Sequence, residues 1–231
     1  MHHVEIGADI VARVLARRGR LHLFDALDPA RTAFVIVDMQ NLFCKPGAPS
    51  EVPAARGIVD NINALNRELR TLGVHVVWIH SAVVISHGRS DWDKFLDNFV
   101  AAEVRERTRE ALRPDGDGAR LWHELEVAAD DIRIVKNRYS CFTPGSSQLE
   151  RVLRGLGIDN VLIGGTKTNV CCESTARDAM MLDYDVVMVS DCCAALSDRE
   201  HLATLENMIQ QFGDVLTAEE ALAALRAQPN R

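Results

Sequence analysis

Short, continuously apolar segments that alternate with helical segments constrain the fold of this chain more than any other feature of its sequence. The first apolar segment, residues 33–37, ends in Asp38, and a helical pattern over residues 58–72 then ends at Gly73. A strand that is apolar at every position is typical of a parallel sheet covered by helices on both faces. Strand, helix and strand joined by short links form a right-handed parallel crossover.

The same alternation continues to the end of the chain. Further strands are predicted at residues 74–80, 132–135, 160–163 and 186–190, with a short apolar segment at 214–216, and helices are predicted at 93–112, 199–211 and from residue 218. This order predicts a three-layer α/β/α sandwich with a mainly parallel sheet. We expect a single domain over residues 1–231, in which residues 1–30 form an N-terminal helical extension.

Composition and charge argue against several classes of function. A net charge of −7 argues against a nucleic-acid partner, because such proteins usually carry a basic face. No apolar run approaches the roughly 18 residues of a membrane span, and the first residues lack the pattern of a signal peptide. The six cysteines include two adjacent pairs, a spacing unlike a disulfide framework or a CxxC zinc site. We therefore expect reduced thiols, a cytoplasmic location and no membrane partner.

The segment that follows the strand at residues 160–163 carries the strongest functional signal. Two glycines end this strand, and a helical pattern over residues 170–181 begins after a short polar connection. Free N–H groups and the positive end of the macrodipole favour negative charge at a helix N-terminus. Cys171 and Cys172 lie in that first turn, where a thiol is expected to be biased toward the thiolate. Either cysteine is eligible, and either could instead be a small buried apolar residue.

Two further residues are expected at the same edge of the sheet. Asp38 ends the first predicted strand and Lys136 ends the third, and ligands of an open parallel sheet bind beyond the carboxyl ends of its strands. A carboxylate that takes a thiol proton, a lysine that keeps it ionised and a thiol at a helix start together predict an acyl-transfer site. Asp38 could instead cap a helix, and Lys136 could be an exposed loop lysine.

Three motifs give this constellation a family resemblance. They are Val-Asp-Met-Gln-Asn-Leu-Phe at residues 37–43, Val-Lys-Asn-Arg-Tyr-Ser-Cys-Phe at 135–142 and Gly-Thr-Lys-Thr-Asn-Val-Cys at 165–171, the last continued by Glu-Ser-Thr-Ala-Arg-Asp at 173–178. From residue 33 to the C-terminus the chain resembles the isochorismatase-like cysteine hydrolases. That superfamily includes nicotinamidases, biuret hydrolases, N-carbamoylsarcosine amidohydrolases and ureidoacrylate amidohydrolases, and the third motif looks most like the last of these.

The resemblance implies a role for each matching position. It implies Asp38 as the general base, Lys136 as its partner and Cys171, rather than Cys172, as the nucleophile. It also implies a cis peptide bond before Lys167 and an oxyanion hole made by the backbone N–H groups of Lys167 and Cys171. Lys167 itself departs from the family pattern, which has a small residue there.

The resemblance also bears on metals, cofactors and assembly. The nicotinamidase branch binds a metal through an Asp-x-His motif after the second strand, and residues 80–87 contain no such carboxylate. We therefore predict no metal and no cofactor. Homo-oligomers, dimers or tetramers, are usual in this superfamily, so we expect one here.

The predicted function is hydrolysis of a small carboxamide, ureido or N-carbamoyl compound through a thioester, releasing ammonia or an amine. Residues on connections at the active end could contact this substrate or merely pack: Asn41, His80, Trp92, Tyr139, Phe142 and Asn169. Two alternatives stay open, an isochorismatase-type vinyl-ether hydrolase and a non-catalytic thiol protein with a redox or scaffold role. The pair Cys192-Cys193 is expected to lie in the core.

Overall fold

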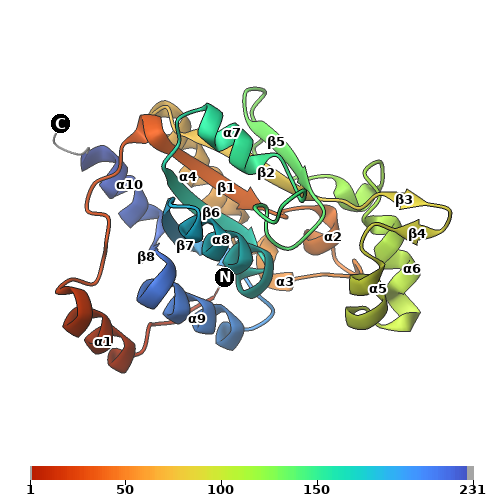
Figure 1. The fold of residues 1–231 in the computed structure, drawn as a ribbon, viewed down its shortest axis with the longest axis horizontal. Coiled ribbons are helices and arrows are strands. Elements are labelled where there is room, and N and C mark those ends of the chain that lie inside the picture. The colour runs from red at the N-terminus through yellow and green to blue at the C-terminus, as the bar shows by residue number, and fades with distance from the viewer. Residues whose placement is uncertain (1, 228–231) are drawn as a thin grey trace.

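The computed structural model describes residues 2–227 of the chain and contains a six-stranded sheet. All neighbouring strands of this sheet pair in parallel, in the order β5-β2-β1-β6-β7-β8. Figure 1 shows the strands, which are β1 (Thr32–Val37), β2 (His75–Ser81), β5 (Ile132–Lys136), β6 (Asn160–Thr166), β7 (Asp185–Ala194) and β8 (Asp214–Leu216). The predicted mainly parallel sheet is confirmed.

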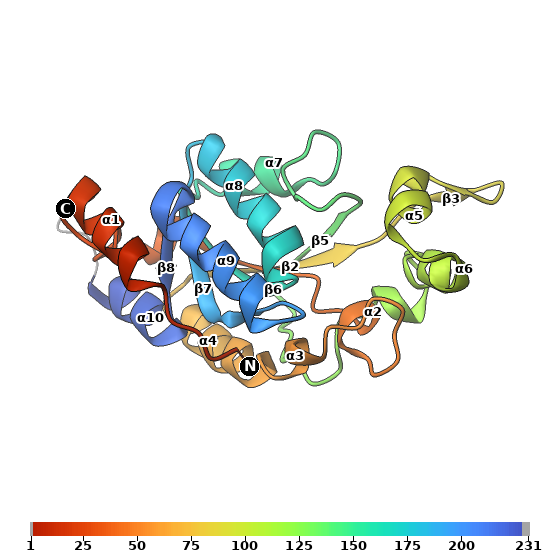
Figure 2. The same ribbon diagram turned by 90° about the horizontal axis from the view of Figure 1, so that it is seen from below.

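Different helices cover the two faces of the sheet (Figure 2). One face carries α4 (Val59–Thr71) and α10 (Ala218–Ala227), and the other carries α7 (Leu149–Gly155), α8 (Glu173–Met181) and α9 (Asp198–Asn207). In β1, Phe34 and Ile36 pack into the first layer and Val35 into the second, because successive side chains of a strand face opposite sides. Every residue of β1 is buried, which explains why the segment is apolar throughout.

The direction in which the chain adds strands reverses between β1 and β6. From β1 the chain adds β2 and β5 on one side, then returns to pair β6 with β1 and adds β7 and β8 on the other side. In an open parallel sheet, the crevice beyond the carboxyl ends of the strands at such a reversal is the usual ligand site. Asp38 follows β1, and the π-helical turn η3 (Thr168–Cys172) follows β6, so both lie at this point.

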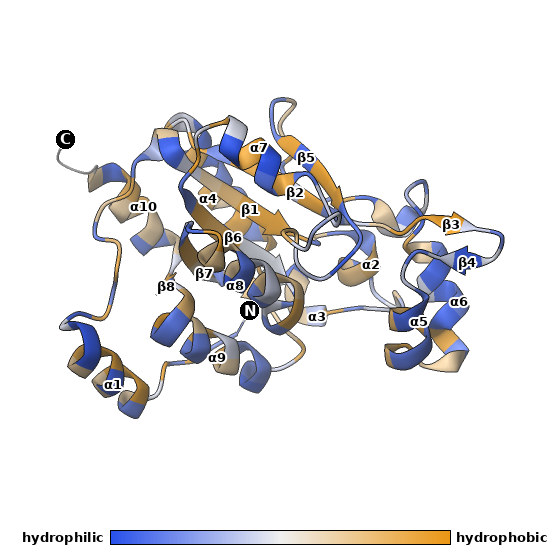
Figure 3. Cartoon of the chain, in the orientation of Figure 1, coloured by the Kyte–Doolittle hydropathy of each residue, from blue (hydrophilic) through white to orange (hydrophobic). Residues whose placement is uncertain are grey.

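The connection between β2 and β5 projects beyond one end of the sheet (Figures 1 and 2). It contains the hairpin β3 (Ile85–Ser86) and β4 (Arg89–Ser90), the helices α5 (Asp93–Phe99) and α6 (Ala102–Ala111), and the turn η2 (Asp117–Ala119). The helices of this connection are largely hydrophilic, in contrast to the apolar strands of the sheet (Figure 3). Leu96 and Leu112 are nevertheless buried, so the connection has an apolar inner side.

The single helix predicted over residues 93–112 is wrong, because two helices form there. Val100 is extended, with φ −118° and ψ 124°, and separates α5 from α6. Arg105 of α6 donates to the carbonyl oxygens of Asp97 and Val100 at 3.1 and 3.4 Å. These bonds satisfy carbonyl groups at the end of α5 that lack a partner within the helix. The end of α5 is stabilised by the Arg105 side chain of the next helix. The sequence between the two helices therefore contains no glycine or proline that would indicate where α5 ends.

β6 and β7 are longer than predicted. Gly164 and Gly165 were expected to end the strand, but β6 continues through them to Thr166. Gly165 has φ +107°, and a Cβ atom there would lie 2.0 Å from the carbonyl oxygen of Val37 in β1. The two strands approach so closely only because this position has no side chain. Similarly, β7 extends past Asp191, so Cys192 and Cys193 lie within the strand and are buried.

The N-terminal helix α1 (Ala8–Arg18) buries Ile10 and Val14 in the second layer and ends at Gly19, which has φ +74°. The remaining short elements are η1 (Pro29–Arg31), α2 (Asn41–Cys44), α3 (Pro53–Arg56) and η4 (Met208–Phe212). None of the helices between residues 2 and 227 combines the length and the apolar character that a membrane crossing needs.

Candidate active site

A buried ion pair lies at the carboxyl ends of the central strands. Lys136, the last residue of β5, donates from Nζ to Oδ2 of Asp38 at 2.8 Å. The two side chains are 1% and 0% exposed. Charges withdrawn from water in this way require a close partner and further hydrogen bonds. The predicted proximity of the two residues is therefore observed, and their burial distinguishes Lys136 from an exposed loop lysine.

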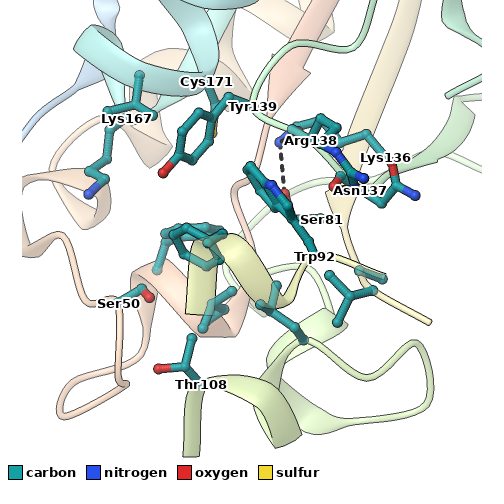
Figure 4. Close-up of a pocket in the computed structure, with 17 residues that line it drawn as sticks. Ser50, Ser81, Trp92, Thr108, Lys136, Asn137, Arg138, Tyr139, Lys167 and Cys171 are labelled. Carbon is teal, nitrogen blue, oxygen red and sulfur yellow. Dashed lines mark hydrogen bonds between the residues drawn. The ribbon is translucent and has the colours of Figure 1, made fainter. Parts of the chain in front are cut away.

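Ser81, the last residue of β2, completes a closed network around Asp38. Lys136 Nζ donates to Ser81 Oγ at 2.7 Å, the bond drawn in Figure 4, and to the carbonyl oxygen of Arg138 at 3.1 Å. Ser81 Oγ in turn donates to Oδ1 of Asp38 at 2.8 Å. All three ammonium donors are thus used, and both carboxylate oxygens of Asp38 are held.

Gln40 fixes the position of Ser81. Its Oε1 accepts from the backbone N–H of Ser81 at 2.6 Å, and its Nε2 donates to the carbonyl oxygen of Ser81 at 3.1 Å. Asp38 has φ +57°, a left-handed conformation that aspartate tolerates better than most residues. This conformation turns the chain at the end of β1 while the N–H of Asp38 still bonds to the carbonyl oxygen of Ile79 at 3.1 Å.

The charge of Lys136 is stabilised by its surroundings. Burial by itself lowers the pKa of Lys136, but the negative charge of Asp38 and the hydrogen bond to it act in the opposite sense, and the net pKa is raised. Lys136 therefore remains a cation throughout the ordinary range of pH.

Cys171 lies in η3, is 5% exposed and lines a cavity beside this network. Burial raises the pKa of its thiol well above the ordinary value, and the negative charge of Asp38 adds to this effect, while the positive charge of Lys136 opposes it. The expectation that this position favours the thiolate is therefore wrong for the resting site. The loss of hydration on burial is the largest cause of this shift in pKa.

Cys172 has a different environment from its neighbour. Its Sγ contacts the carbonyl oxygen of Gly164 at 3.7 Å, and the residue is fully buried in the apolar layer under α8 and α9. Burial and the neighbouring thiol of Cys193 raise its pKa. Cys171 lines the cavity and Cys172 does not. Adjacent residues in a helical turn point in different directions, so only one of the two thiols faces the site.

The turn between β6 and Cys171 leaves a backbone N–H group without a backbone acceptor among residues 2–227. The Thr166–Lys167 peptide bond is cis. The carbonyl oxygen of Lys167 accepts from the N–H groups of Val170 and Cys172 at 3.1 and 3.2 Å. The N–H group of Lys167 donates to no backbone carbonyl in the described part of the chain. A backbone N–H that is free beside a nucleophile can stabilise an oxyanion.

The cavity lies between the sheet edge and the projecting connection (Figure 4). Its apolar wall comes from α2, from the residues after β2, from α5, from the end of α6 and from η3, namely Leu42, Phe43, Ala82, Val83, Trp92, Phe95, Leu112 and Val170. Its polar wall consists of Ser50, Ser81, Thr108, Lys136, Asn137, Arg138, Tyr139, Lys167 and Cys171. A mostly apolar cavity with a few convergent polar groups is typical of a small-molecule site.

Two of the six residues predicted to contact substrate line this cavity. Trp92 and Tyr139 do so, and their rings meet edge to face with centroids 4.8 Å apart. Trp92 also carries the guanidinium group of Arg138 over its ring at 5.1 Å. These contacts form an aromatic wall facing Cys171.

The other four predicted contact residues do not line the cavity. Asn41 donates to Asp117 at 3.1 Å outside it, and Phe142 packs in the core against Tyr184. His80 has Nδ1 at 3.0 Å from the carbonyl oxygen of Ala119, whereas Nε2 is buried without a partner among the described residues. Asn169 has a buried Oδ1 that also lacks a partner there. His80 points away from the cavity because successive side chains of β2 face opposite sides, and the next residue, Ser81, faces the site.

Ser81 and Gln40 were missed by sequence reasoning. The sequence did contain a signal for Ser81, because it lies at the carboxyl end of a strand, as Asp38 and Lys136 do. In the structure it pairs in register with Lys136. No comparable signal marks Gln40, because it acts on backbone groups of a residue distant in sequence. Among residues 2–227, no cluster of three histidine, cysteine or acidic side chains could hold a metal ion.

Comparison with known proteins extends these observations. The family model of the isochorismatase domain matches residues 32–220. Ureidoacrylate amidohydrolase RutB of Rhizobium rhizogenes is 32% identical over 222 residues, which cover 86% of this chain and 85% of that relative. A cysteine hydrolase from Pseudomonas syringae pv. phaseolicola has a TM-score of 0.80 at 28% identity, covering 90% of this chain and 98% of its own. N-carbamoylsarcosine amidase from Thermoplasma acidophilum has a TM-score of 0.64 at 25% identity, covering 82% and 97% respectively.

Proposed function

Since the chain belongs to the isochorismatase family, we propose that it is a cysteine-dependent amidohydrolase of a small carboxamide, ureido or N-carbamoyl compound. Relatives whose names describe amide hydrolysis support the reaction class. The observation that carries the proposal is the buried Asp38–Lys136 pair, whose lysine lines the same cavity as the Cys171 thiol. A general base, its charge partner and a nucleophile are the groups that acyl transfer requires.

In the first step, Asp38 takes the proton of Cys171 as sulfur attacks the carbonyl carbon. Because burial raises the pKa of the thiol, its proton must move to Asp38 during the attack. Lys136 and Ser81 hold the two carboxylate oxygens in place. Because the pKa of Lys136 is raised, its ammonium group remains charged beside the carboxyl group of Asp38.

In the second step, the tetrahedral intermediate collapses to a thioester. The negative charge that develops on oxygen is stabilised by the backbone N–H groups of Lys167 and Cys171. Ammonia or an amine leaves with the proton that Asp38 had accepted, which restores the carboxylate. Asp38 then activates a water molecule that hydrolyses the thioester, and its proton returns to the sulfur of Cys171.

Two neighbouring cysteine substitutions test this proposal. Cys171→Ala is expected to abolish ammonia release, since no other thiol of the described chain lines the cavity with it, whereas Cys172→Ala keeps most of the activity and loses some stability. Ammonia release is measured over a panel of ureido acids, N-carbamoyl amino acids, biuret and nicotinamide. Acid-quenched enzyme is examined by mass spectrometry for an acyl group on the peptide that contains Cys171.

The same two variants distinguish the alternatives. Turnover that is lost in Cys172→Ala but retained in Cys171→Ala would reassign the nucleophile. Turnover of a vinyl ether by Cys171→Ala would favour an isochorismatase-type reaction, which does not need the thiol. Wild-type protein that neither releases ammonia nor accumulates a thioester with any amide of the panel would refute the proposed amidohydrolase activity.

A further inference from the structure

Three cationic side chains and no acidic side chain line the cavity beside Cys171. This is unusual for a chain with a net charge of −7. A low-dielectric cavity lined by one sign of charge attracts ligands of the opposite sign. The three cations, Lys136, Arg138 and Lys167, differ in how far their charges are already satisfied.

Two of the three cations are held by the protein itself. Lys136 is neutralised by Asp38 and has no donor left. Arg138 donates to the carbonyl oxygens of Asn137 and Asp91 at 2.7 and 3.1 Å, and its guanidinium group lies over Trp92. Lys136 cannot bind an anionic ligand without losing contacts, whereas the guanidinium group of Arg138 lies over Trp92 and keeps three of its five N–H donors.

Lys167 has no such partner. Within residues 2–227, its ammonium group makes no hydrogen bond and no ion pair, although the residue lines the cavity. Lys167 and Tyr139 both line the cavity, and in the view of Figure 4 the ammonium nitrogen and the phenolic oxygen point in a similar direction. Burial raises the pKa of Tyr139, so this hydroxyl remains protonated and able to donate. Both polar ends can donate to an anion.

We propose that the ammonium group of Lys167 binds the carboxylate of the substrate, with Tyr139 as a second donor, and that the enzyme acts on ureido or N-carbamoyl acids rather than on neutral amides. This inference rests on the proposed amidohydrolase function. A lysine ammonium is a mobile point charge on a flexible stem, suited to a carboxylate at the end of a short chain.

The position of Lys167 limits the length of this substrate. Its backbone N–H lies at the proposed oxyanion hole, and its side chain starts from the same residue. The carboxylate must therefore lie within the reach of one lysine side chain from the reacting carbonyl group. Apolar residues such as Phe43, Leu112 and Val170 form the rest of the wall and accommodate the carbon chain between the two groups.

The test compares 3-ureidopropionate with N-propylurea, which has a ureido group and a chain of similar length but no carboxylate. Ammonia release gives kcat and KM for each compound with wild-type enzyme, Lys167→Met and Lys167→Arg. We expect Lys167→Met to raise KM for 3-ureidopropionate about 10- to 100-fold more than it raises KM for N-propylurea, the size of a lost charge-assisted hydrogen bond. Lys167→Arg is expected to retain most of the preference for 3-ureidopropionate over N-propylurea. Lys94→Met, at an exposed position of α5, is the matched control.

Binding is measured separately from turnover. This distinguishes an error in the role of Lys167 from an error in the proposed amidohydrolase activity. Calorimetry in a Cys171→Ala background compares the affinity for the same two compounds, with Lys or Met at position 167. A preference for 3-ureidopropionate that is lost with Met supports the role of Lys167 even if neither compound is turned over. The role of Lys167 is overturned if the ratio of the affinities for 3-ureidopropionate and N-propylurea is the same with Lys and with Met at position 167. It is also overturned if the preference for 3-ureidopropionate is lost in Arg138→Met instead. Absence of ammonia release with both compounds in wild-type enzyme counts only against turnover of these amides.

Discussion

At the scale of single residues, the site depends on charges that the fold withdraws from water. Asp38 and Lys136 are both buried: the three donors of Lys136 reach Asp38, Ser81 and the carbonyl oxygen of Arg138, and each carboxylate oxygen of Asp38 accepts one hydrogen bond. Such a pair contributes less to stability than to geometry, because its desolvation offsets its attraction. Removal of one member leaves the other as an unpaired buried charge.

Lys136→Met tests this description. We expect a loss of about 3–5 kcal/mol in the free energy of unfolding, because Asp38 would remain buried without its partner, together with loss of nearly all ammonia release. The double variant Asp38→Asn/Lys136→Met should recover much of the stability and none of the activity. Chemical denaturation and the ammonia assay measure the two effects. A nearly normal rate in Lys136→Met would contradict the role of the pair.

At the scale of elements, the contact between β1 and β6 brings the catalytic residues together. Their register pairs Val37 with Gly165, so Asp38 and the turn before Cys171 begin at the same level of the sheet. The two strands can approach so closely because Gly165 has no side chain, and Gly165 has a positive φ just before Thr166 and Lys167. A glycine that looked like a strand terminator in the sequence is a packing requirement in the fold.

Gly165→Ala is expected to lower the free energy of unfolding by about 3 kcal/mol or more, since the added Cβ atom would meet backbone atoms of Val37 that cannot move aside. Gly155→Ala is the matched control, because Gly155 ends the helix α7 with open space around it. That change should be neutral or slightly stabilising. Equal destabilisation of the two variants in thermal and urea unfolding would show that the close approach is unimportant.

At the scale of the whole molecule, the N-terminal segment reaches the active-site turn through buried polar contacts. His2 accepts from the backbone N–H of Ala195 at 2.9 Å and stacks on His201 with ring centroids 4.5 Å apart. Nδ1 of His201 lies 2.9 Å from Oγ1 of Thr168 in η3. Residues from the beginning and the end of the chain thus support the turn that holds Cys171.

These contacts predict a pH dependence of stability. Burial, with a further contribution from the charge of His2, lowers the pKa of His201 to about 4 against the opposing charge of Asp198. A histidine whose pKa is lowered by folding stabilises the folded state above its unfolded pKa of about 6.5. This contribution, up to about 3 kcal/mol, is lost as the pH falls toward 4, because the unfolded chain then binds the extra proton.

Urea unfolding at several pH values between 4.5 and 7.5 measures this slope. His201→Gln, which keeps a polar group near Thr168, should be less stable at pH 7 but should lose less stability on acidification. Parallel slopes for wild type and variant would assign the acid sensitivity to other groups. Exchange of His75, whose ring is not in the core, is the matched control.

The sequence by itself determined the parallel α/β architecture and the edge of the sheet where chemistry is expected. Continuous apolar strands can only be buried between two layers, and the carboxyl ends of parallel strands meet at one edge. Asp38, Lys136 and the cysteine pair followed from their positions at strand ends, and the resemblance singled out Cys171. These features depend on local periodicity and on motif order, which a sequence carries directly.

Only the tertiary structure decided which side chains share the site. Ser81 rather than His80 faces Asp38, and Asn41 and Phe142 turn away from the cavity, because strand alternation and contacts between distant segments set these directions. The thiol of Cys171 is held protonated by a desolvation that no local pattern reveals. Folding pairs Lys136 with Asp38 and leaves the ammonium group of Lys167 without a partner among the described residues. The burial of a side chain and the pairing of its charge are properties of the folded chain. They determine the chemistry of residues whose type and position alone are known from the sequence.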